Sequence, residues 1–488
     1  MKRYYALIII LFFFTMPMLT YGQGLGCIYD EVADGNAPRR PRLMTRDYVV
    51  LPDSFSLKNY CPTPKSQGDY GTCTAWATTY AARTICEAIN NNWNIAADSI
   101  SKEAFAPIFI YKQLNADLGC EKGTSIYYAL GLLKSKGAPK LNSFDVLCSD
   151  SIPSHLYNEA TNYKIDSYTQ LFNNYDESQQ DVNKVEVVKK ALYENHPVVF
   201  SMNVYNSFWR NNVTDPWDGL QDSIVGSHAM CVIGYNNNKY GGAFEIMNSW
   251  GSDWGSDGFL WIKYDDFSKN SNLAYDVYLK KTVQQDTIKQ EPTPYSDTKM
   301  YSMAGNMAIV GKDGGDISRV MIDDHASIPY YLMEDEFLSG KRFRLEVSNE
   351  EPAWVYVIAS DKTNHVNILF PYDNNISPFL NYSKNDIAIP GETHEFELDE
   401  VDGTDYFCVL YSQDKLDIHD IANRIHTSDG SFYQKLRKVL GDSLAPQEDI
   451  RYIRNYIGFS AKTNQPIVPL VVEITHKGID VKYNSDKR

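Results

Sequence analysis

The chain has 488 residues, of which 43% are hydrophobic and 22% are charged, as is ordinary for a soluble globular protein. This length exceeds what one hydrophobic core usually supports, so we expect two or three domains. The formal charge of −16 argues against nucleic acid as a partner, because phosphate binding needs concentrated lysine and arginine.

The first 22 residues are typical of an export signal. Lys2 and Arg3 precede an apolar run over residues 6–19, and Gly22 supplies the small residue that signal peptidase prefers. About 14 to 16 apolar residues fall short of the roughly 20 that a membrane span requires. We therefore expect cleavage after residue 22, no transmembrane segment in the mature chain, and a periplasmic, cell-surface or secreted protein.

Residues 23–50 are polar and rich in proline and arginine, which predicts an extended lead-in, too short for a folded inhibitory prodomain. From residue 51 onward, apolar residues recur at helical spacing. The predicted helices span residues 73–90, 104–114, 125–136 and 185–195, and a strand follows over residues 197–204. The Gly71-Thr72 turn places Cys73 at the start of the first helix.

After His228 the pattern changes to short apolar or alternating runs, separated by asparagine and glycine. These runs predict antiparallel strands over residues 229–235, 243–248 and 258–264. A helical half followed by a β half is an α+β arrangement, with a cleft between the two halves. We assign residues 51–279 to this domain.

A linker is predicted over residues 280–300, which are polar and contain two prolines. Beyond it, β runs recur around two helical segments, at residues 416–424 and 432–440. Residues 301–488 therefore predict a second, mostly β domain whose function the sequence does not reveal. Acidic turns at residues 314–316 and 323–324 could suggest calcium, but solvated loops explain them better.

All eight cysteines follow the predicted signal, and so lie in an oxidising compartment if the chain is exported. If one is a catalytic thiol, seven remain, so at least one more is free or pairs between chains. Cys231 and Cys408 lie in apolar runs and are expected to be buried thiols. No C-x-x-C pair or histidine cluster is present, so no metal site is predicted. Residues 24–27 faintly resemble a lipoprotein cleavage site, but Gly24 stands where a large aliphatic is expected.

Cys73 and His228 are the candidate nucleophile and base. A helix start favours the thiolate form of a cysteine, and a nearby imidazole can take its proton. Each residue alone is more often structural than catalytic, because buried cysteines and packed histidines are common. The remaining histidines before residue 280, His155 and His196, lack supporting neighbours.

Asn248 and Gln67 favour a catalytic role for Cys73 and His228 over a structural one. The amide of Asn248 can accept a hydrogen bond from the imidazole and fix its tautomer. The adjacent Trp250 can cover that bond from water. Gln67 can direct its amide N–H at the oxygen that becomes negative, with the backbone N–H of Cys73 as second donor. The four residues together predict a complete thiol-protease site.

Three motifs closely resemble those of papain-type cysteine peptidases. They are Gln67-Gly68-x-x-Gly71-Thr72-Cys73, Ser227-His228-Ala229, and Asn248-Ser249-Trp250-Gly251-x-x-Trp254-Gly255. The resemblance covers about residues 50 to 275 and implies a two-lobed fold. It also implies that Gly123, Ser227 and Ala229 line the substrate cleft, in a pocket that admits a bulky apolar side chain. No cofactor is implied, and the expected partner is a protein or peptide substrate.

The sequence departs from the family pattern at several positions. Thr74 replaces the usual tryptophan, and Tyr70 replaces a cysteine that usually pairs with the residue at Cys120. Cys148 is a possible alternative partner for Cys120. The long propeptide of lysosomal members is absent, so the chain resembles bacterial members. An exported cysteine endopeptidase is the favoured interpretation; a transpeptidase or amidase, a processing enzyme for one partner, and an inactive binding protein are the alternatives.

Overall fold

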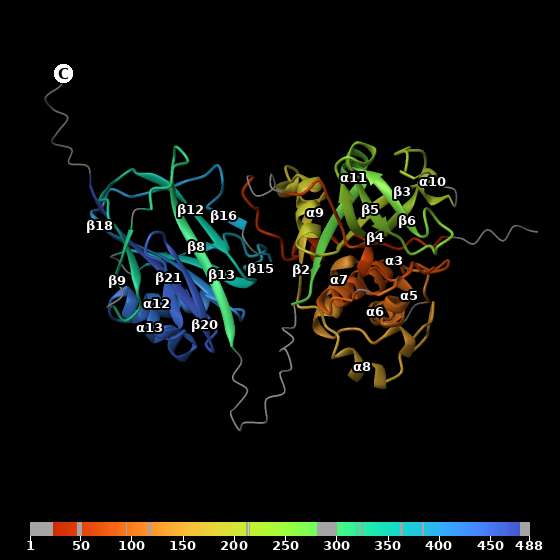
Figure 1. The fold of residues 1–488 in the computed structure, drawn as a ribbon, viewed down its shortest axis with the longest axis horizontal. Coiled ribbons are helices and arrows are strands. Elements are labelled where there is room, and N and C mark those ends of the chain that lie inside the picture. Colours follow the sequence, from red (N-terminus) through yellow and green to blue (C-terminus); the bar gives the residue numbers. More distant parts are fainter. Residues whose placement is uncertain are drawn as a thin grey trace, which may run out of the picture.

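The computed structural model describes residues 23–45, 51–93, 95–115, 119–210, 213, 215–280, 300–318, 320–323, 326–361, 365–382 and 385–478. Two domains lie side by side within these residues (Figure 1). The predicted export signal, nearly all of the predicted linker and the last ten residues of the chain lie outside the described residues.

The helical half of the N-terminal domain is built around the helix that starts at Cys73. This helix is continuous as α3 (Cys73–Ala75), a π-helical stretch η2 (Trp76–Arg83) and α4 (Thr84–Asn90). Helices α6 (Pro107–Leu114) and α7 (Ile126–Ser135) pack against it. The other helices of the domain are α5 (Ala97–Lys102), α8 (His155–Ala160), α9 (Lys184–Tyr193), α10 (Asn206–Trp209) and α11 (Tyr264–Asn270).

The β half is one antiparallel sheet, which has seven strands in the described part of the domain. The strand order is β2-β7-β3-β4-β5-β6, and β1 pairs with β4. The strands are β1 (Ser54–Ser56), β2 (Ser167–Asn173), β3 (Val198–Tyr205), β4 (Ile224–Asn236), β5 (Ala243–Met247), β6 (Phe259–Lys263) and β7 (Ser271–Tyr278). Helix α3 and the η2 stretch pack on β4, so one hydrophobic core joins the two halves.

The C-terminal domain is a sandwich of an eight-stranded and a six-stranded sheet, counted over the described residues. One core lies between the sheets, and helices α12 (Ile418–Thr427) and α13 (Phe432–Leu440) cover the outer face of the larger sheet with a second core. The larger sheet has the order β14-β13-β18-β21-β10-β9, with β11 paired to β21 and β15 to β13. The smaller sheet has the order β16-β12-β8-β20-β19, with β17 paired to β12. Together with the helical half, this confirms the predicted α+β domain followed by a mostly β region.

The strands of the C-terminal domain are β8 (Tyr301–Gly311), β9 (Val320–Asp323), β10 (Tyr330–Met333), β11 (Phe337–Leu338), β12 (Arg342–Asn349), β13 (Ala353–Ser360), β14 (Val366–Phe370), β15 (Phe379–Leu380), β16 (Asn385–Ile389), β17 (Phe396–Glu397), β18 (Gly403–Ser412), β19 (Ile450–Tyr452), β20 (Gly458–Thr463) and β21 (Ile467–Lys477). All the pairings are antiparallel except those of β10 and β11 with β21.

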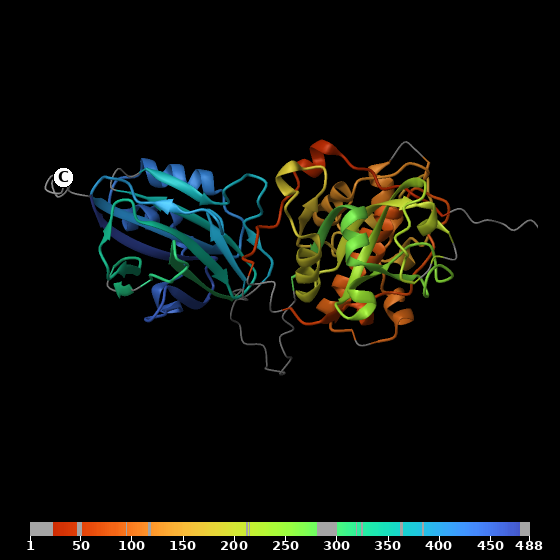
Figure 2. The same ribbon diagram turned by 90° about the horizontal axis from the view of Figure 1, so that it is seen from above.

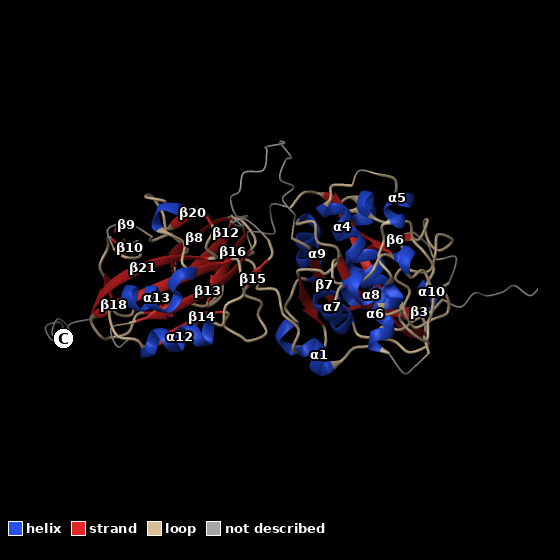
Figure 3. Cartoon of the chain, turned by 90° about the horizontal axis from the view of Figure 1, so that it is seen from below, coloured by secondary structure: helices blue, strands red, loops and turns tan. Residues whose placement is uncertain are grey.

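The lead-in runs across both domains, as the red segment between them shows (Figure 2). Its one short helix, α1 (Glu31–Gly35), lies on the N-terminal domain near the boundary (Figure 3). Ala37 is buried in the core of the N-terminal domain, and Leu43 is buried in the core of the C-terminal domain. The lead-in is therefore part of the packing of both domains.

Candidate active site

Cys73 is the first residue of α3, and its side chain is fully buried. Burial raises the pKa of the thiol to about 11, while the backbone N–H groups of Ala229 and Gly26 and the hydroxyl of Thr74 act to lower it. The contact with Ala229 ties the thiol to β4, the strand that carries His228. Gly26 belongs to the lead-in, so the lead-in itself lies against the thiol.

His228 and Asn248 are joined by a buried hydrogen bond. The His228 Nε2 atom lies 2.7 Å from Asn248 Oδ1, which also accepts from the backbone N–H of Ser249. The Trp250 ring stacks on the imidazole with ring centroids 4.4 Å apart. Burial lowers the pKa of His228 to about 4, against a smaller upward effect of Asn248. The other ring nitrogen, Nδ1, is buried and makes no hydrogen bond within the described part of the chain.

Gln67 is held so that its amide N–H points to a peptide carbonyl. Its Oε1 atom accepts from the Ser249 hydroxyl at 2.6 Å, and its backbone N–H donates to the Ser249 carbonyl. The Nε2 atom therefore donates, to Tyr70 O at 2.7 Å and to Gly24 O at 3.1 Å. Because Ser249 adjoins Asn248, one turn positions both amides.

Residues 23–28 of the lead-in lie across this group, and we call them the plug. The Gly24 carbonyl oxygen accepts from Gln67 Nε2 and, at 3.2 Å, from the Trp250 indole. Both backbone and side-chain groups of the cleft form hydrogen bonds with the plug. The further hydrogen bonds are Gly24 N to Gly68 O, Trp209 Nε1 to Gln23 O, Gly26 N and Cys27 N to Ser227 O, Thr124 N to Gly26 O, and Ile28 N to Thr124 O.

The three predicted cleft residues all lie at the plug. A Cβ atom on Gly123 would lie 2.2 Å from the Gly26 carbonyl oxygen, so the close approach requires glycine there. The Ser227 carbonyl accepts from the plug, and Ala229 lies beside the thiol. The hydroxyls of Thr74 and Ser201 lie beside the side chain of Cys27 in the plug.

The plug is the feature that sequence reasoning missed. The lead-in is extended around α1, as expected, but it also fills the cleft. Its contacts are mostly backbone hydrogen bonds, which leave no trace in residue type. The signal that could have revealed it is the Gly24-Leu25-Gly26 pattern, because a narrow cleft between two walls favours glycine.

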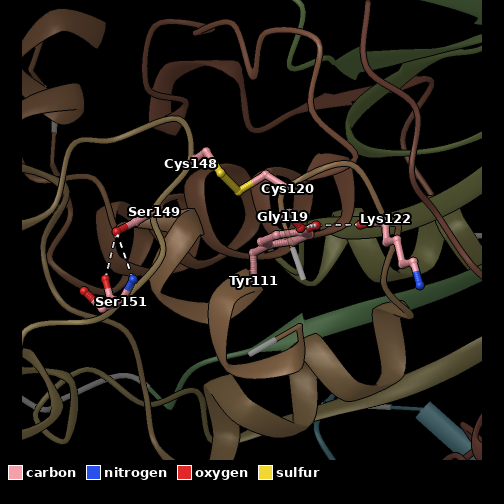
Figure 4. Close-up of a disulfide and its surroundings, with 7 residues drawn as sticks. All are labelled: Tyr111, Gly119, Cys120, Lys122, Cys148, Ser149 and Ser151. Atoms are coloured by element: carbon pink, nitrogen blue, oxygen red, sulfur yellow. Dashed lines mark hydrogen bonds between the residues drawn. A yellow bond between two sulfur atoms is a disulfide. The ribbon is translucent and has the colours of Figure 1, made fainter. Parts of the chain in front are cut away.

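Cys120 and Cys148 form a disulfide with a Cα–Cα distance of 5.8 Å, so the alternative partner suggested by the sequence is the actual one (Figure 4). The Cys120 carbonyl accepts from Gly71 N at 2.7 Å, two residues before Cys73. The Tyr111 hydroxyl donates to the carbonyls of Gly119 and Lys122. These bonds fix the wall of the cleft that ends at Gly123.

Six cysteines remain free, and all but Cys27 are buried, including Cys231 and Cys408 as predicted. Within the described ranges, no group of three or more histidine, cysteine, aspartate or glutamate side chains is arranged to hold a metal ion. Asp316 caps its own turn by accepting from the backbone N–H of Ser318. Asp323 accepts from the Tyr330 hydroxyl.

Comparison with known proteins identifies the first domain. The sequence model described as "Papain family cysteine protease" matches residues 51–280. These residues form a papain-family cysteine protease domain. We refer to them as the protease domain; the match does not extend into the β-rich C-terminal domain.

Curated relatives match the same half of the chain. An uncharacterized peptidase C1-like protein of Acanthamoeba polyphaga mimivirus is 27% identical over 256 residues, which are 49% of this chain and 78% of the relative. A cysteine protease of Blomia tropicalis is 24% identical over 253 residues, 50% of this chain and 68% of the relative. Among solved structures, xylellain, a cysteine protease from Xylella fastidiosa, aligns with a TM-score of 0.42 at 22% identity, covering 53% of this chain and 98% of xylellain.

A cysteine protease acts on peptide bonds, so the protease domain has protein or peptide substrates. None of the helices in the described ranges is long and apolar enough to cross a membrane.

Proposed function

We propose that Cys73, His228, Asn248 and Gln67 are the catalytic residues of this protease, and that the chain is an exported endopeptidase of the bacterial type. The observation that supports the proposal is the position of the plug in the cleft. The carbonyl of Gly24 accepts a hydrogen bond from the amide N–H of Gln67, and the backbone of Gly26 in the same segment lies beside the Cys73 thiol. The cleft thus holds peptide backbone at the atoms that would react.

In the proposed reaction, His228 takes the proton of the Cys73 thiol, and the sulfur bonds to the substrate carbonyl carbon. The resulting oxyanion accepts hydrogen bonds from Gln67 Nε2 and from the backbone N–H of Cys73. The carbon–nitrogen bond then breaks, and His228 gives the proton to the leaving amine, so a thioester remains. Water attacks the thioester, His228 takes a proton from it, and the carboxylate product and the thiol are released.

Asn248 and Trp250 act on His228 in this scheme. The 2.7 Å bond to Asn248 engages Nε2 and so leaves Nδ1 for the proton of the thiol. The stacked Trp250 ring shields that bond from water. Under the plug, burial favours the neutral thiol and the neutral imidazole. The thiolate form is therefore expected once the cleft opens to water.

Labelling with a papain-selective epoxide tests the site. The final extent of labelling, read by peptide mass after long incubation, does not depend on how fast a covered thiol becomes accessible. We expect one label on Cys73 and none when His228 is replaced by alanine. Labelling elsewhere, or equal labelling of His228→Ala, would contradict the assignment. A peptide substrate with an added amine nucleophile separates hydrolysis, which yields a free carboxylate, from transpeptidation, which yields an amide.

The export proposal rests on residues 1–22, which are typical of a cleaved signal. Intact mass of the protein collected from outside the cytoplasm should correspond to a chain that begins at Gln23. A chain that begins at a lipid-modified Cys27 would instead establish the lipoprotein alternative, and an uncleaved chain would contradict export.

A further inference from the structure

We propose that the C-terminal domain carries a peptide-binding edge at β16, and that residues 38–45 of the lead-in occupy this edge as a donated strand. We call residues 38–45 the strap. In this arrangement the strap keeps the two domains together even when the linker between them is cut. The inference concerns the docking of the C-terminal domain, so it does not depend on the chemistry proposed for the cleft.

Strand β16 ends the smaller sheet of the C-terminal domain and pairs with β12 on one side. The strap lies along its other side. Leu43 and Ile387 form an antiparallel bridge, and Met44 N donates to Asp386 O at 3.1 Å. The edge of a sheet presents unpaired backbone groups that an extended peptide can satisfy. The strap therefore takes the place of a further strand.

The loop between β14 and β15 binds the strap at a second point. Arg39 N donates to Asn375 O, and Ser377 N donates to Arg39 O at 2.8 Å. The Arg39 guanidinium also binds the carboxylate of Asp373 in the same loop, at 2.8 Å. The C-terminal domain thus binds both the backbone and the side chain of Arg39.

The strap places one large apolar side chain inside the C-terminal domain. Leu43 is only 6% exposed and belongs to the core between the two sheets, which also contains Ile376 and Ile387. Where an added strand supplies backbone hydrogen bonds, the pockets that take its side chains give the selectivity. The edge is therefore expected to prefer an extended peptide with a large aliphatic residue at this position.

The strap is bound to the protease domain at the same time. Gln170 N donates to Pro38 O, and Arg40 N donates to Gln170 O. Gln170 lies on β2, the strand that ends the sheet of the protease domain. The strap therefore pairs with an end strand of each domain and joins the two sheets through its own backbone.

Buried charge at Arg40 makes the strap costly to detach. The Arg40 guanidinium contacts Glu194 and lies 3.8 Å from Asp276, both in the protease domain. It also stacks over the Tyr382 ring of the C-terminal domain, 4.6 Å from the ring centroid. Asn381 of the C-terminal domain donates to Asp276 at 3.1 Å. Removing Arg40 would leave uncompensated buried charge at the boundary between the domains.

Cutting the linker tests whether the strap holds the domains together. A recognition sequence for a site-specific protease, placed within residues 285–295 of the full mature chain, allows this cut, and intact mass confirms that it is the only one. A polar linker only raises the local concentration of one domain near the other. We therefore expect the two pieces to elute together in size-exclusion chromatography. Separate elution of the pieces would overturn the proposal.

Leu43→Ala distinguishes the strap from direct contacts between the domains. In the cut protein it should raise the Kd of the two pieces by on the order of 30-fold or more, as loss of a buried leucine usually does. Leu338→Ala, at a leucine of the same domain that is 61% exposed, is the matched control and should leave the Kd within about twofold. An unchanged Kd in both Leu43→Ala and Arg40→Ala would show that direct contacts, such as that of Tyr278 with Phe379, hold the domains, and the proposal would fail.

A synthetic peptide of residues 36–45 tests the edge as a binding site. In the full chain that carries both Arg40→Ala and Leu43→Ala, the edge is held only weakly by its own strap. The fluorescent wild-type peptide should bind this variant, as measured by anisotropy, and the peptide with Leu43→Ala should bind on the order of 30-fold more weakly. The wild-type chain, whose edge is occupied, should bind neither peptide at the same concentration. Equal binding of both peptides, or binding of neither to the double variant, would overturn the peptide-binding edge.

Discussion

The candidate active site and the core of the C-terminal domain use buried polar side chains in different ways. At the candidate active site, side chains bind one another: Asn248 holds His228, and Ser249 holds Gln67. In the core of the C-terminal domain, Tyr411 and Asn349 bind backbone instead. The Tyr411 hydroxyl donates to the carbonyls of Asn306 and Ser348, and Asn349 donates to those of Leu380 and Tyr382.

This difference explains why one domain reveals its chemistry and the other does not. A network of side chains that hydrogen-bond to one another restricts the residue type at each of its positions, because only an amide or a hydroxyl can make the required hydrogen bond there. A side chain that donates hydrogen bonds to backbone carbonyls stabilises a strand or a turn, and many residue types can do that. The contrast predicts that substitutions at the candidate active site mainly change turnover, whereas substitutions in the core of the C-terminal domain mainly change folding.

The sharpest test compares a buried free cysteine from each domain. Cys73→Ser should lower kcat/KM by on the order of 10⁴-fold or more, because it replaces the proposed nucleophile with a weaker one that is not activated. Cys408→Ser, whose thiol is equally buried, should change the denaturant midpoint and leave kcat/KM within about twofold. Loss of turnover in Cys408→Ser at full folding would remove the distinction between the domains.

A smaller effect is expected for the proposed oxyanion donor. Gln67→Ala should lower kcat by roughly 10- to 1,000-fold with a small change in KM, because in the proposed reaction its N–H stabilises charge that exists only in the transition state. Gln413→Ala, whose amide accepts from Lys280 at the edge of the C-terminal domain, is the matched control. A change in KM alone for Gln67→Ala would show that the residue binds substrate without stabilising the oxyanion.

Much of this site could be predicted because its chemistry restricts residue types. The helix from Cys73 to Asn90 and strands β4 and β5 follow from local spacing, and the amide, imidazole and thiol follow from the motifs. Strands β2 and β7 were not predicted. Their buried polar residues, such as Thr169 and Asp276, disturb the apolar pattern, and each is satisfied by the other across the sheet.

The contacts of the lead-in could not be predicted for another reason. They are backbone hydrogen bonds and long-range pairs, such as Arg40 with Asp276. The local sequence does not specify which strand edge a backbone segment will pair with. Similarly, the sequence left the partner of Cys120 open, because cysteine spacing does not determine connectivity.

The disulfide between Cys120 and Cys148 allows the stabilities of the two domains to be compared. It closes a loop of 28 residues in the protease domain, so Cys148→Ser should lower the free energy of unfolding of that domain by about 3 kcal/mol. Urea titration followed by near-UV and far-UV circular dichroism measures this loss. Reductant should destabilise the wild type by a similar amount and leave Cys148→Ser unchanged. An equal loss in both domains would mean that the two domains unfold as one unit.

The smallest expected effect is the pH dependence of stability that arises from His228 in the protease domain. Burial lowers the pKa of His228 from its ordinary 6.5 to about 4, so the unfolded chain takes up this proton first as the pH falls. The stability from the neutral, buried ring is therefore present above pH 6.5 and is lost as the pH falls toward 4. Between pH 7 and pH 5 the free energy of unfolding falls by about 2 kcal/mol for this reason.

His228→Gln tests this effect, because glutamine can hydrogen-bond to Asn248 but cannot titrate. Between pH 7 and pH 5 the unfolding free energy of this variant should fall by about 2 kcal/mol less than that of the wild type. An identical slope in both proteins would place the titration elsewhere and show that the ring accepts a proton in the folded, plugged protein.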